Sequence, residues 1–428
     1  MPDAALPPLL WMAPALAGGG YSSEAIAFAL GLAPRLSSRG FALRQFAEQP
    51  DQSFMAGLPP SATAVLESVT EFPGMNRFDA RLRRRGVVVC HSTPDAWVPS
   101  KFPGWDELAP CPPKAAAFTI GRTMFETDAM PTEWVERCNR MDEVWVPTEF
   151  HRAAFAAAGV DAAKLVVVGE PVDTAFYDPA VHAPLPLRAL AGAPSGATPF
   201  RFLSVFKWEA RKGWDALLSA FFAEFGADEP VELLLKTKPF HSSDDFEGLV
   251  EEWAAARGLP SSRPPLRIIG SEYELSELPR LYAAADAFVL PSRGEGWGRP
   301  HVEAMAMGLP VIATNWSGPT AFLDEAVGYP LEYTLQPVPD ELNLRGHHWA
   351  EPSVTHLRAL MRRLVSHPDE ARARGRAARE RMVSRYRPEA LALDVETELR
   401  RIGDALEARP RARRQDGARA SGGWRDEL

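Results

Sequence analysis

The stretch 286–323 constrains the fold of this chain more than any other part of the sequence. A short apolar run ends at Pro291, and a glycine-rich loop follows it. Pro300 suits the first turn of a helix, where a missing N–H costs nothing, and Gly308 is suited to end that helix. A second apolar run begins at Val311. The order strand, loop, short helix, strand is therefore predicted, as in a parallel α/β sheet.

Two acidic residues stand in this unit, Glu295 in the loop and Glu303 in the helix. In an open α/β sheet such a loop lies at the carboxyl ends of the strands, where ligands bind, and the helix offers free N–H groups to a phosphate. Carboxylates are poor phosphate ligands but good acceptors for sugar hydroxyls, so the combination indicates a sugar attached to a phosphate. The alternative is that Glu303 only complements the helix N-terminus and that Glu295 is a solvated loop residue.

The sequence Glu-Gly-Trp-Gly-Arg-Pro-His-Val-Glu from 295 to 303, followed by Ala-Met-Ala-Met-Gly-Leu-Pro-Val, resembles the signature of the retaining glycosyltransferases of family 4. That family has the GT-B fold, in which two Rossmann-like domains face each other across a cleft. The resemblance implies a hexosyltransferase that moves a sugar from a nucleotide-diphosphate donor, with a UDP- or GDP-sugar expected, and retains the anomeric configuration. It also implies that the donor is a substrate and that neither a cofactor nor a metal ion is required.

The resemblance assigns roles to single residues of the loop and helix. It implies that Glu295 approaches the transferred sugar as a catalytic residue and that Glu303 holds the ribose. The donor sugar and ribose are expected to contact Glu295, Gly296, Trp297, Gly298 and Glu303. Arg299 and His301 stand where the family more often has aliphatic residues.

Basic residues occupy a second predicted junction between a strand and a helix. Lys207, Arg211 and Lys212 lie between the apolar run 202–206 and a helix that begins near Trp214. Cations and helix N–H groups together would hold a diphosphate, although basic loops without a ligand are equally common. The family resemblance adds that a lysine in an Arg-Lys-Gly sequence meets the donor phosphates, which makes Lys212 a catalytic candidate. Lys207 is expected to replace an arginine that the family has nearby.

The N-terminal half offers further candidates. Gly19 and Gly20 belong to a glycine turn after the first predicted strand, where the backbone either approaches a bound ligand or only makes a tight turn. The family resemblance implies that this turn contacts the donor diphosphate or the acceptor. The spacing is not that of a dinucleotide-binding fingerprint. His91 ends an apolar strand, and in family 4 a histidine at a comparable strand end often reaches the donor sugar. His91 is therefore a catalytic candidate, with an ordinary hydrogen-bonded strand end as the alternative.

Two charged clusters stand next to other predicted strands of this half. Arg122 stands near Glu126 and Asp128, and the sequence leaves open whether the arginine pairs with a phosphate or with Glu126. The segment 81–85 carries four arginines. A solvated loop is the simpler interpretation, and a site for an anionic acceptor or a membrane-surface patch is the alternative.

Alternating strands and helices, with the family resemblance, predict the domain organisation. The predicted units are an N-terminal Rossmann-like domain on the acceptor side (1–178), a Pro- and Gly-rich linker (179–199), a C-terminal Rossmann-like domain on the donor side (200–385), a helix that crosses back to the first domain (386–407), and a disordered tail (408–428).

Composition excludes several other functions. The 428 residues carry a net charge of −9, which argues against a nucleic-acid binder. Three widely spaced cysteines, Cys90, Cys111 and Cys138, predict neither a disulfide framework nor a zinc site and favour a reducing compartment. The apolar stretch 6–17 is better explained as a buried strand than as a signal peptide. We therefore expect a cytoplasmic protein and interpret the terminal Arg-Asp-Glu-Leu as chance.

The expected partners are a nucleotide sugar and an acceptor that the sequence does not identify. Two other functions use the same scaffold: a sugar-nucleotide epimerase, and a non-catalytic protein that binds nucleotide sugars. The adjacent His347 and His348 point in different directions on any regular element, so no metal site is expected there.

Overall fold

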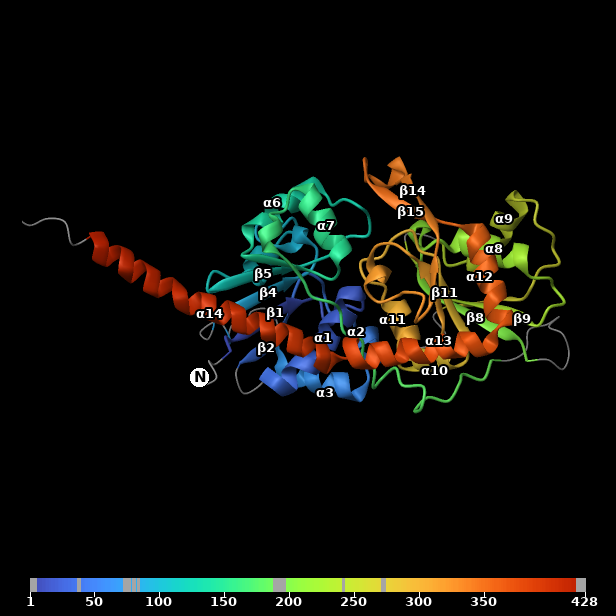
Figure 1. Cartoon of the computed structure of the whole chain (residues 1–428), viewed down its shortest axis with the longest axis horizontal. Helices are drawn as coiled ribbons and strands as arrows, with labels where there is room; N and C mark the ends of the chain where they lie inside the picture. The colour runs from blue at the N-terminus through green and yellow to red at the C-terminus, as the bar shows by residue number, and fades with distance from the viewer. Residues whose placement is uncertain are drawn as a thin grey trace, which may run out of the picture.

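A computed structural model describes residues 6–36, 40–71, 78, 82, 85–187, 198–240, 243–270 and 275–420, without the side chains of residues 105, 108 and 409–420. Two α/β domains lie side by side in it, each built on one parallel sheet (Figure 1). The predicted pair of parallel-sheet domains is confirmed.

The N-terminal domain is built on a seven-stranded sheet with the order β3-β2-β1-β4-β5-β6-β7. All of its strand pairs are parallel. Its strands are β1 (Leu9–Ala13), β2 (Phe41–Gln45), β3 (Thr70–Glu71), β4 (Val87–His91), β5 (Phe118–Arg122), β6 (Glu143–Val146) and β7 (Leu165–Val167). Its helices are α1 (Gly20–Leu36), α2 (Gln52–Ala56), α3 (Pro60–Val69), α5 (Trp105–Leu108), α6 (Thr132–Arg140) and α7 (Glu149–Ala158). Strand β1 is buried along its whole length, as expected of an apolar strand with both faces covered.

The C-terminal domain is built on a six-stranded parallel sheet with the order β10-β9-β8-β11-β12-β13. Its strands are β8 (Phe200–Trp208), β9 (Val231–Pro239), β10 (Leu266–Ile269), β11 (Ala287–Leu290), β12 (Val311–Thr314) and β13 (Tyr329–Leu331). Its helices are the single turn η4 (Ala210–Lys212), α8 (Trp214–Glu224), α9 (Phe246–Ala256), α10 (Leu278–Ala283), α11 (Arg299–Ala306), α12 (Val354–Ser366) and α13 (Pro368–Arg381). The predicted strand–loop–helix–strand unit is confirmed as β11, α11 and β12.

Two further elements tie the domains together. Helix α14 (Pro388–Ala420) leaves the C-terminal domain and packs along α1, and its Leu391, Val395 and Leu399 are buried in the N-terminal core (Figure 1). In the structure this helix extends past residue 407, where the sequence predicted its end. Residues 421–428 lie outside the described part. The predicted domain boundaries therefore stay predictions. An antiparallel hairpin, β14 (Tyr333–Pro337) and β15 (His348–Pro352), stands between the domains.

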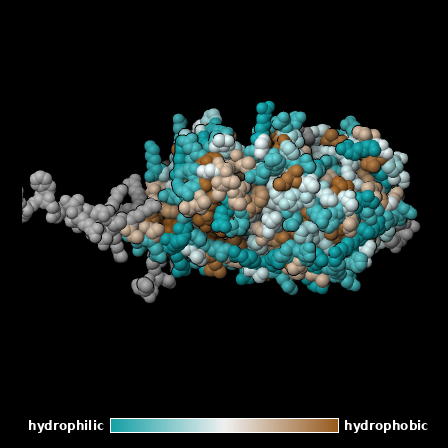
Figure 2. Space-filling view, turned by 45° about the horizontal axis from the view of Figure 1, so that its top comes forward, coloured by the Kyte–Doolittle hydropathy of each residue, from teal (hydrophilic) through white to brown (hydrophobic). Residues whose placement is uncertain are grey.

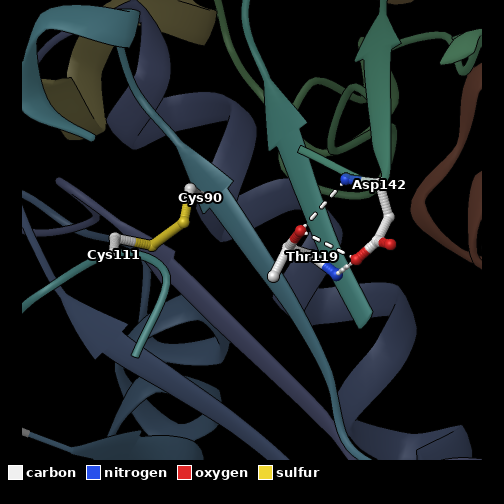
Figure 3. Close-up of a disulfide and its surroundings, with 4 residues drawn as sticks. All are labelled: Cys90, Cys111, Thr119 and Asp142. Atoms are coloured by element: carbon white, nitrogen blue, oxygen red, sulfur yellow. Dashed lines mark hydrogen bonds between the residues drawn. A yellow bond between two sulfur atoms is a disulfide. The ribbon is translucent and has the colours of Figure 1, made fainter. Parts of the chain in front are cut away.

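A disulfide joins Cys90, in β4, to Cys111 in the loop that precedes β5, with the two Cα atoms 5.7 Å apart (Figure 3). The prediction that the three cysteines form no disulfide is therefore wrong, because the fold brings two of them within bonding distance. Beside this pair Asp142 accepts hydrogen bonds from the N–H and the hydroxyl of Thr119, which fixes β5 against the start of β6 (Figure 3). Disulfides are rare in reducing compartments, so the predicted compartment loses its main support.

On the face drawn in Figure 2, hydrophilic residues spread over both domains and hydrophobic residues form separate patches. Across the described part of the chain, every helix is too short or too polar to cross a membrane.

Candidate functional site

The loop after β11 and the turn η4 after β8 meet at the carboxyl ends of neighbouring strands. Lys212 Nζ donates to both carboxylate oxygens of Glu295, each at 2.8 Å. Arg211 donates to the carbonyl of Gly294 at 2.7 Å, and its Nη1 lies 3.5 Å from Glu295 Oε2. The structure therefore brings together the first acidic and the two basic residues that the sequence singled out.

Burial and the cations act in opposite directions on this acid. Burial raises the pKa of Glu295, but Lys212 and Arg211 outweigh it and hold the pKa at about 2. Burial and the adjacent Arg211 lower the pKa of Lys212. Glu295 is consequently an anion at neutral pH and accepts hydrogen bonds without donating any.

Residues that the sequence did not single out hold the two loops in place. Gly213 has φ = +64°, and a Cβ there would lie 2.0 Å from the carbonyl oxygen of Pro291, so glycine is required where the loops touch. Arg293 donates to both oxygens of Asp215 at 2.9 Å and through Nε to Glu351 at 2.6 Å. These ion pairs join residues far apart in sequence, and no local pattern points to them.

Glu303 faces a different part of the boundary between the domains. Tyr282 Oη donates to its Oε2 at 3.1 Å. Burial raises the pKa of Glu303, while Arg299 acts in the opposite direction. Glu303 and Arg299 line a small open cleft of about 50 Å³ between the domains. Its other walls include Ile26, Leu30, Phe54, Asp173 and Leu275.

The three residues that follow Glu295 are placed differently from one another. Trp297 is 2% exposed, and its ring packs in the core against Phe322 at 5.1 Å and Tyr386 at 5.6 Å between centroids. The side chain of Trp297 thus contacts the C-terminal core, which leaves its backbone as the part that faces the loop. Gly296 borders the N-terminal domain, and Gly298 adopts φ = +113° at the start of α11.

His91 does not join this group. Its Nδ1 accepts from Trp11 Nε1 at 3.0 Å, and because an indole only donates, the proton of the ring must be on Nε2. Nε2 then donates to Glu24 at 2.9 Å. Both nitrogens are used inside the N-terminal domain, and His91 is fully buried, so this structure does not place it to contact a sugar.

The structure identifies the partner of Arg122, which the sequence left open. Its Nη2 lies 2.7 Å from Glu24 Oε1 and both side chains are fully buried, so its partner is neither a phosphate nor Glu126. Burial raises the pKa of Glu24, but Arg122 and His91 outweigh it and hold the pKa at about 2. Glu24 lies on α1. Its role in this cluster was not predicted, because the helical pattern of the sequence does not show that an acidic residue faces inward.

Gly19 and Gly20 border open space, whereas the ammonium of Lys207 lies over an aromatic ring. A Cβ added at either glycine would meet no atom within 4 Å, so the backbone at the start of α1 borders open space. The ammonium of Lys207 lies over the ring of Phe240, 5.2 Å from the centroid.

The two adjacent histidines contact the N-terminal domain separately. His347 lies 2.6 Å from the hydroxyl of Thr127, and His348 lies 3.0 Å from Asp128 Oδ2. Within the described ranges, no three His, Cys, Asp or Glu side chains gather closely enough to hold a metal ion.

Two predictions fall wholly or partly outside the described residues. Of the arginine cluster at 81–85, only Arg85 has a described side chain, and it pairs with Glu407 at 2.9 Å. The terminal residues 425–428 are not described.

Two facing parallel-sheet domains with a helix that returns to the first domain define the GT-B fold, and this chain has that fold. A structure of HepE (Alr3699) from Anabaena with UDP and glucose aligns with a TM-score of 0.61 at 16% identity, over 91% of this chain and 98% of that one. The sucrose-phosphate synthase of Thermosynechococcus elongatus aligns with a TM-score of 0.61 at 18% identity, over 93% and 100%.

Sequence comparison finds relatives over part of the chain. Residues 200–335, which hold both glutamates and the basic pair, match the family model described as Glycosyl transferases group 1. A D-inositol 3-phosphate glycosyltransferase of Segniliparus rotundus is 29% identical over 186 residues, 42% of this chain and 37% of the relative. The lipopolysaccharide core mannosyltransferase LpsB of Rhizobium meliloti is 28% identical over 168 residues, 38% and 45%. The chain thus spans less than half the length of either relative.

Proposed function

We propose that this chain is a retaining glycosyltransferase that moves a sugar from a nucleotide-diphosphate donor, a UDP- or GDP-sugar, to an acceptor. The observation that carries the proposal is the group formed by Arg211, Lys212 and Glu295 at the carboxyl ends of two neighbouring strands. The match of residues 200–335 to glycosyltransferases and the GT-B fold of the whole chain support it.

In this proposal each charged residue has a separate task. Arg211 and Lys212, with the N-terminus of α8, hold the diphosphate and stabilise the charge that develops on it as the glycosidic bond breaks. Two fixed cations supply positive charge that other enzymes take from a metal ion, so we propose that none is needed. Glu295 accepts from hydroxyls of the transferred sugar, and Glu303 accepts from the ribose beside the open cleft.

Substitution of the two key residues tests the proposal. We expect that Lys212→Ala and Glu303→Ala each abolish transfer and leave a folded protein, as judged by circular dichroism. Lys101→Ala is the matched control, because Lys101 is a half-exposed lysine paired with Asp95 and Glu133 in the other domain. Near-normal transfer by either site variant would remove the assignment.

The donor is found by a thermal-shift screen over nucleotide sugars, since a ligand that binds the native state raises its stability by mass action. The same screen separates the alternatives. An epimerase would convert the matched donor with no acceptor present, and a non-catalytic binding protein would bind it without turnover on any acceptor.

A further inference from the structure

The segment after β5, residues 124–128, lies directly against the C-terminal site. A Cβ added to Gly294 would lie 1.9 Å from the carbonyl oxygen of Glu126, and one added to Gly296 would lie 2.3 Å from Met124 Sδ. At Gly294, where the contact is with backbone, any side chain larger than hydrogen would push the domains apart, whereas at Gly296 the side chain of Met124 would have to move. The glycines of the loop therefore have a second role, which is to admit a piece of the opposite domain.

Contacts on the far side of the segment hold it in place. The backbone N–H of His348 donates to Asp128 Oδ1 at 2.7 Å, and the hydroxyl of Thr127 lies 2.6 Å from His347 Nδ1. Both histidines belong to the hairpin region of the C-terminal domain. The segment is thus held between the β11–α11 loop and the hairpin.

The side chain of Glu126 enters the cation site from the N-terminal domain. Its Oε1 lies 3.6 Å from Arg211 Nη2. Arg211 also contacts Glu209 at 2.7 Å and Glu295 at 3.5 Å, so three carboxylates surround one guanidinium. Arg211 therefore has more carboxylates around it than a stable ion pair without a ligand would require.

The three carboxylates are not held equally. Glu295 is bound by Lys212 through both oxygens, and its side chain is 7% exposed. Glu209 makes the shorter contact with Arg211 and is 18% exposed. Glu126 makes the longest contact with Arg211 and is 36% exposed, so it is the anion that leaves at the lowest cost.

We propose that Glu126 is a displaceable counter-ion that occupies the place of the donor diphosphate at Arg211 until the donor binds. The inference rests on the proposed function, because it needs a diphosphate at Arg211 and Lys212. A diphosphate and Glu126 cannot share Arg211 without strong like-charge repulsion, so binding of the diphosphate requires the carboxylate to turn away. When Glu126 turns away, Arg211 loses the attraction of that carboxylate. A ligand with a single weak negative charge replaces this attraction poorly, so the exchange favours the doubly charged donor.

The test measures binding of inorganic pyrophosphate by calorimetry, because this probe requires only the cation site. We expect Glu126→Gln to bind pyrophosphate roughly two- to fivefold more tightly than the wild type at low salt, the range expected of a partly exposed ion pair. The difference should shrink at high salt, since screening weakens the competing pair. Lys212→Ala should lose the binding, which places the probe at this site.

A matched control and a second readout separate this role from a purely structural one. Glu136→Gln makes the same charge change at an exposed glutamate of the same domain, paired with Arg140, and should bind like the wild type. Without ligand, Glu126→Gln should melt at or slightly below the wild-type temperature, yet gain more from pyrophosphate. If Glu126 had only a structural role, the substitution would lower both the melting temperature without ligand and the stabilisation by pyrophosphate.

The outcomes are distinct. Equal or weaker binding by Glu126→Gln, or unchanged binding by Lys212→Ala, would overturn the counter-ion role and leave the proposed function standing if UDP or GDP still binds. A wild-type protein that binds neither pyrophosphate nor UDP, GDP or ADP would overturn both.

Discussion

Each domain places a charged cluster at the carboxyl ends of its parallel strands, yet the two clusters differ in how their charges are used. In the N-terminal domain Glu24 is shared by Arg122 and His91, and all three side chains are fully buried. In the C-terminal domain Arg211 is 21% exposed and is approached by three carboxylates from both domains. A saturated, sealed cluster stabilises a fold, whereas a crowded, open one can exchange a partner for a ligand.

The largest expected effect is on the sealed cluster. Arg122→Met keeps much of the side-chain volume but leaves Glu24 as a buried anion with only His91 beside it. We expect the free energy of unfolding to fall by about 3–5 kcal/mol, the usual cost of breaking a buried pair from one side, as measured by urea denaturation. Arg140→Ala, at an exposed i,i+4 pair, should cost less than about 0.5 kcal/mol. A loss below about 1 kcal/mol for Arg122→Met would show that the cluster is not what stabilises this domain.

The second-largest expected effect concerns the disulfide, which lies within the N-terminal domain. Replacing Cys90 and Cys111 by serine should lower the free energy of unfolding by about 3 kcal/mol, because the bond closes a loop with a sequence separation of 21 residues in the unfolded chain. Reductant should destabilise the wild type and leave the double variant unchanged. Alkylation of the denatured, unreduced protein should modify Cys138 alone, and modification of all three cysteines would contradict the disulfide.

A third effect is the response of the open cluster to acid. The pKa of Glu295 in the folded protein, about 2, lies below the ordinary value of 4.5, so the unfolded chain binds more protons between these values. Stability from this group is therefore present above pH 4.5 and is lost as the pH falls towards 2, by roughly 2–3 kcal/mol. Subtracting the denaturation profile of Glu295→Gln from that of the wild type should reveal this loss, and a difference that does not change with pH would contradict it.

The open cluster was also the one that the sequence could predict. Its glycine-rich loop, Glu295 and its Arg-Lys-Gly turn are local patterns, and a parallel sheet necessarily brings loops after neighbouring strands together. In the structure these two loops meet where Lys212 donates to Glu295. The spacing could not give the direction of each side chain, and Trp297 turned into the core because an indole gains more from burial there than at the loop surface.

The sealed cluster was not predictable for the opposite reason. Glu24 and Arg122 are 98 positions apart, and Cys90 meets Cys111 through an irregular loop, so neither pairing leaves a short-range mark in the sequence. His91 was identified as a strand-end residue, which is correct, but its two hydrogen-bond partners come from the neighbouring strand β1 and from α1, so they depend on how these elements pack. Burial is what distinguishes the two strand ends, and burial is a property of the whole fold.

The smallest expected effect is that of replacing His91, and it tests whether this histidine belongs to the sealed cluster or to the ligand site. In His91→Gln the amide N–H₂ group can still donate to Glu24, but Trp11 loses the acceptor for its buried N–H. We expect the free energy of unfolding to fall by about 1–2 kcal/mol, the cost of one unsatisfied buried donor, with pyrophosphate affinity unchanged within about twofold. Once a donor is known, the transfer rate should likewise stay close to that of the wild type.

The opposite result would reverse the comparison. If His91→Gln kept its unfolding free energy but lost more than about tenfold in transfer rate, the histidine would have to contact the reacting sugar. That would require one of its two hydrogen bonds to open when the donor binds, since both ring nitrogens are engaged without it. The N-terminal cluster would then also exchange a partner for a ligand, and complete burial would no longer distinguish a structural cluster from a catalytic one.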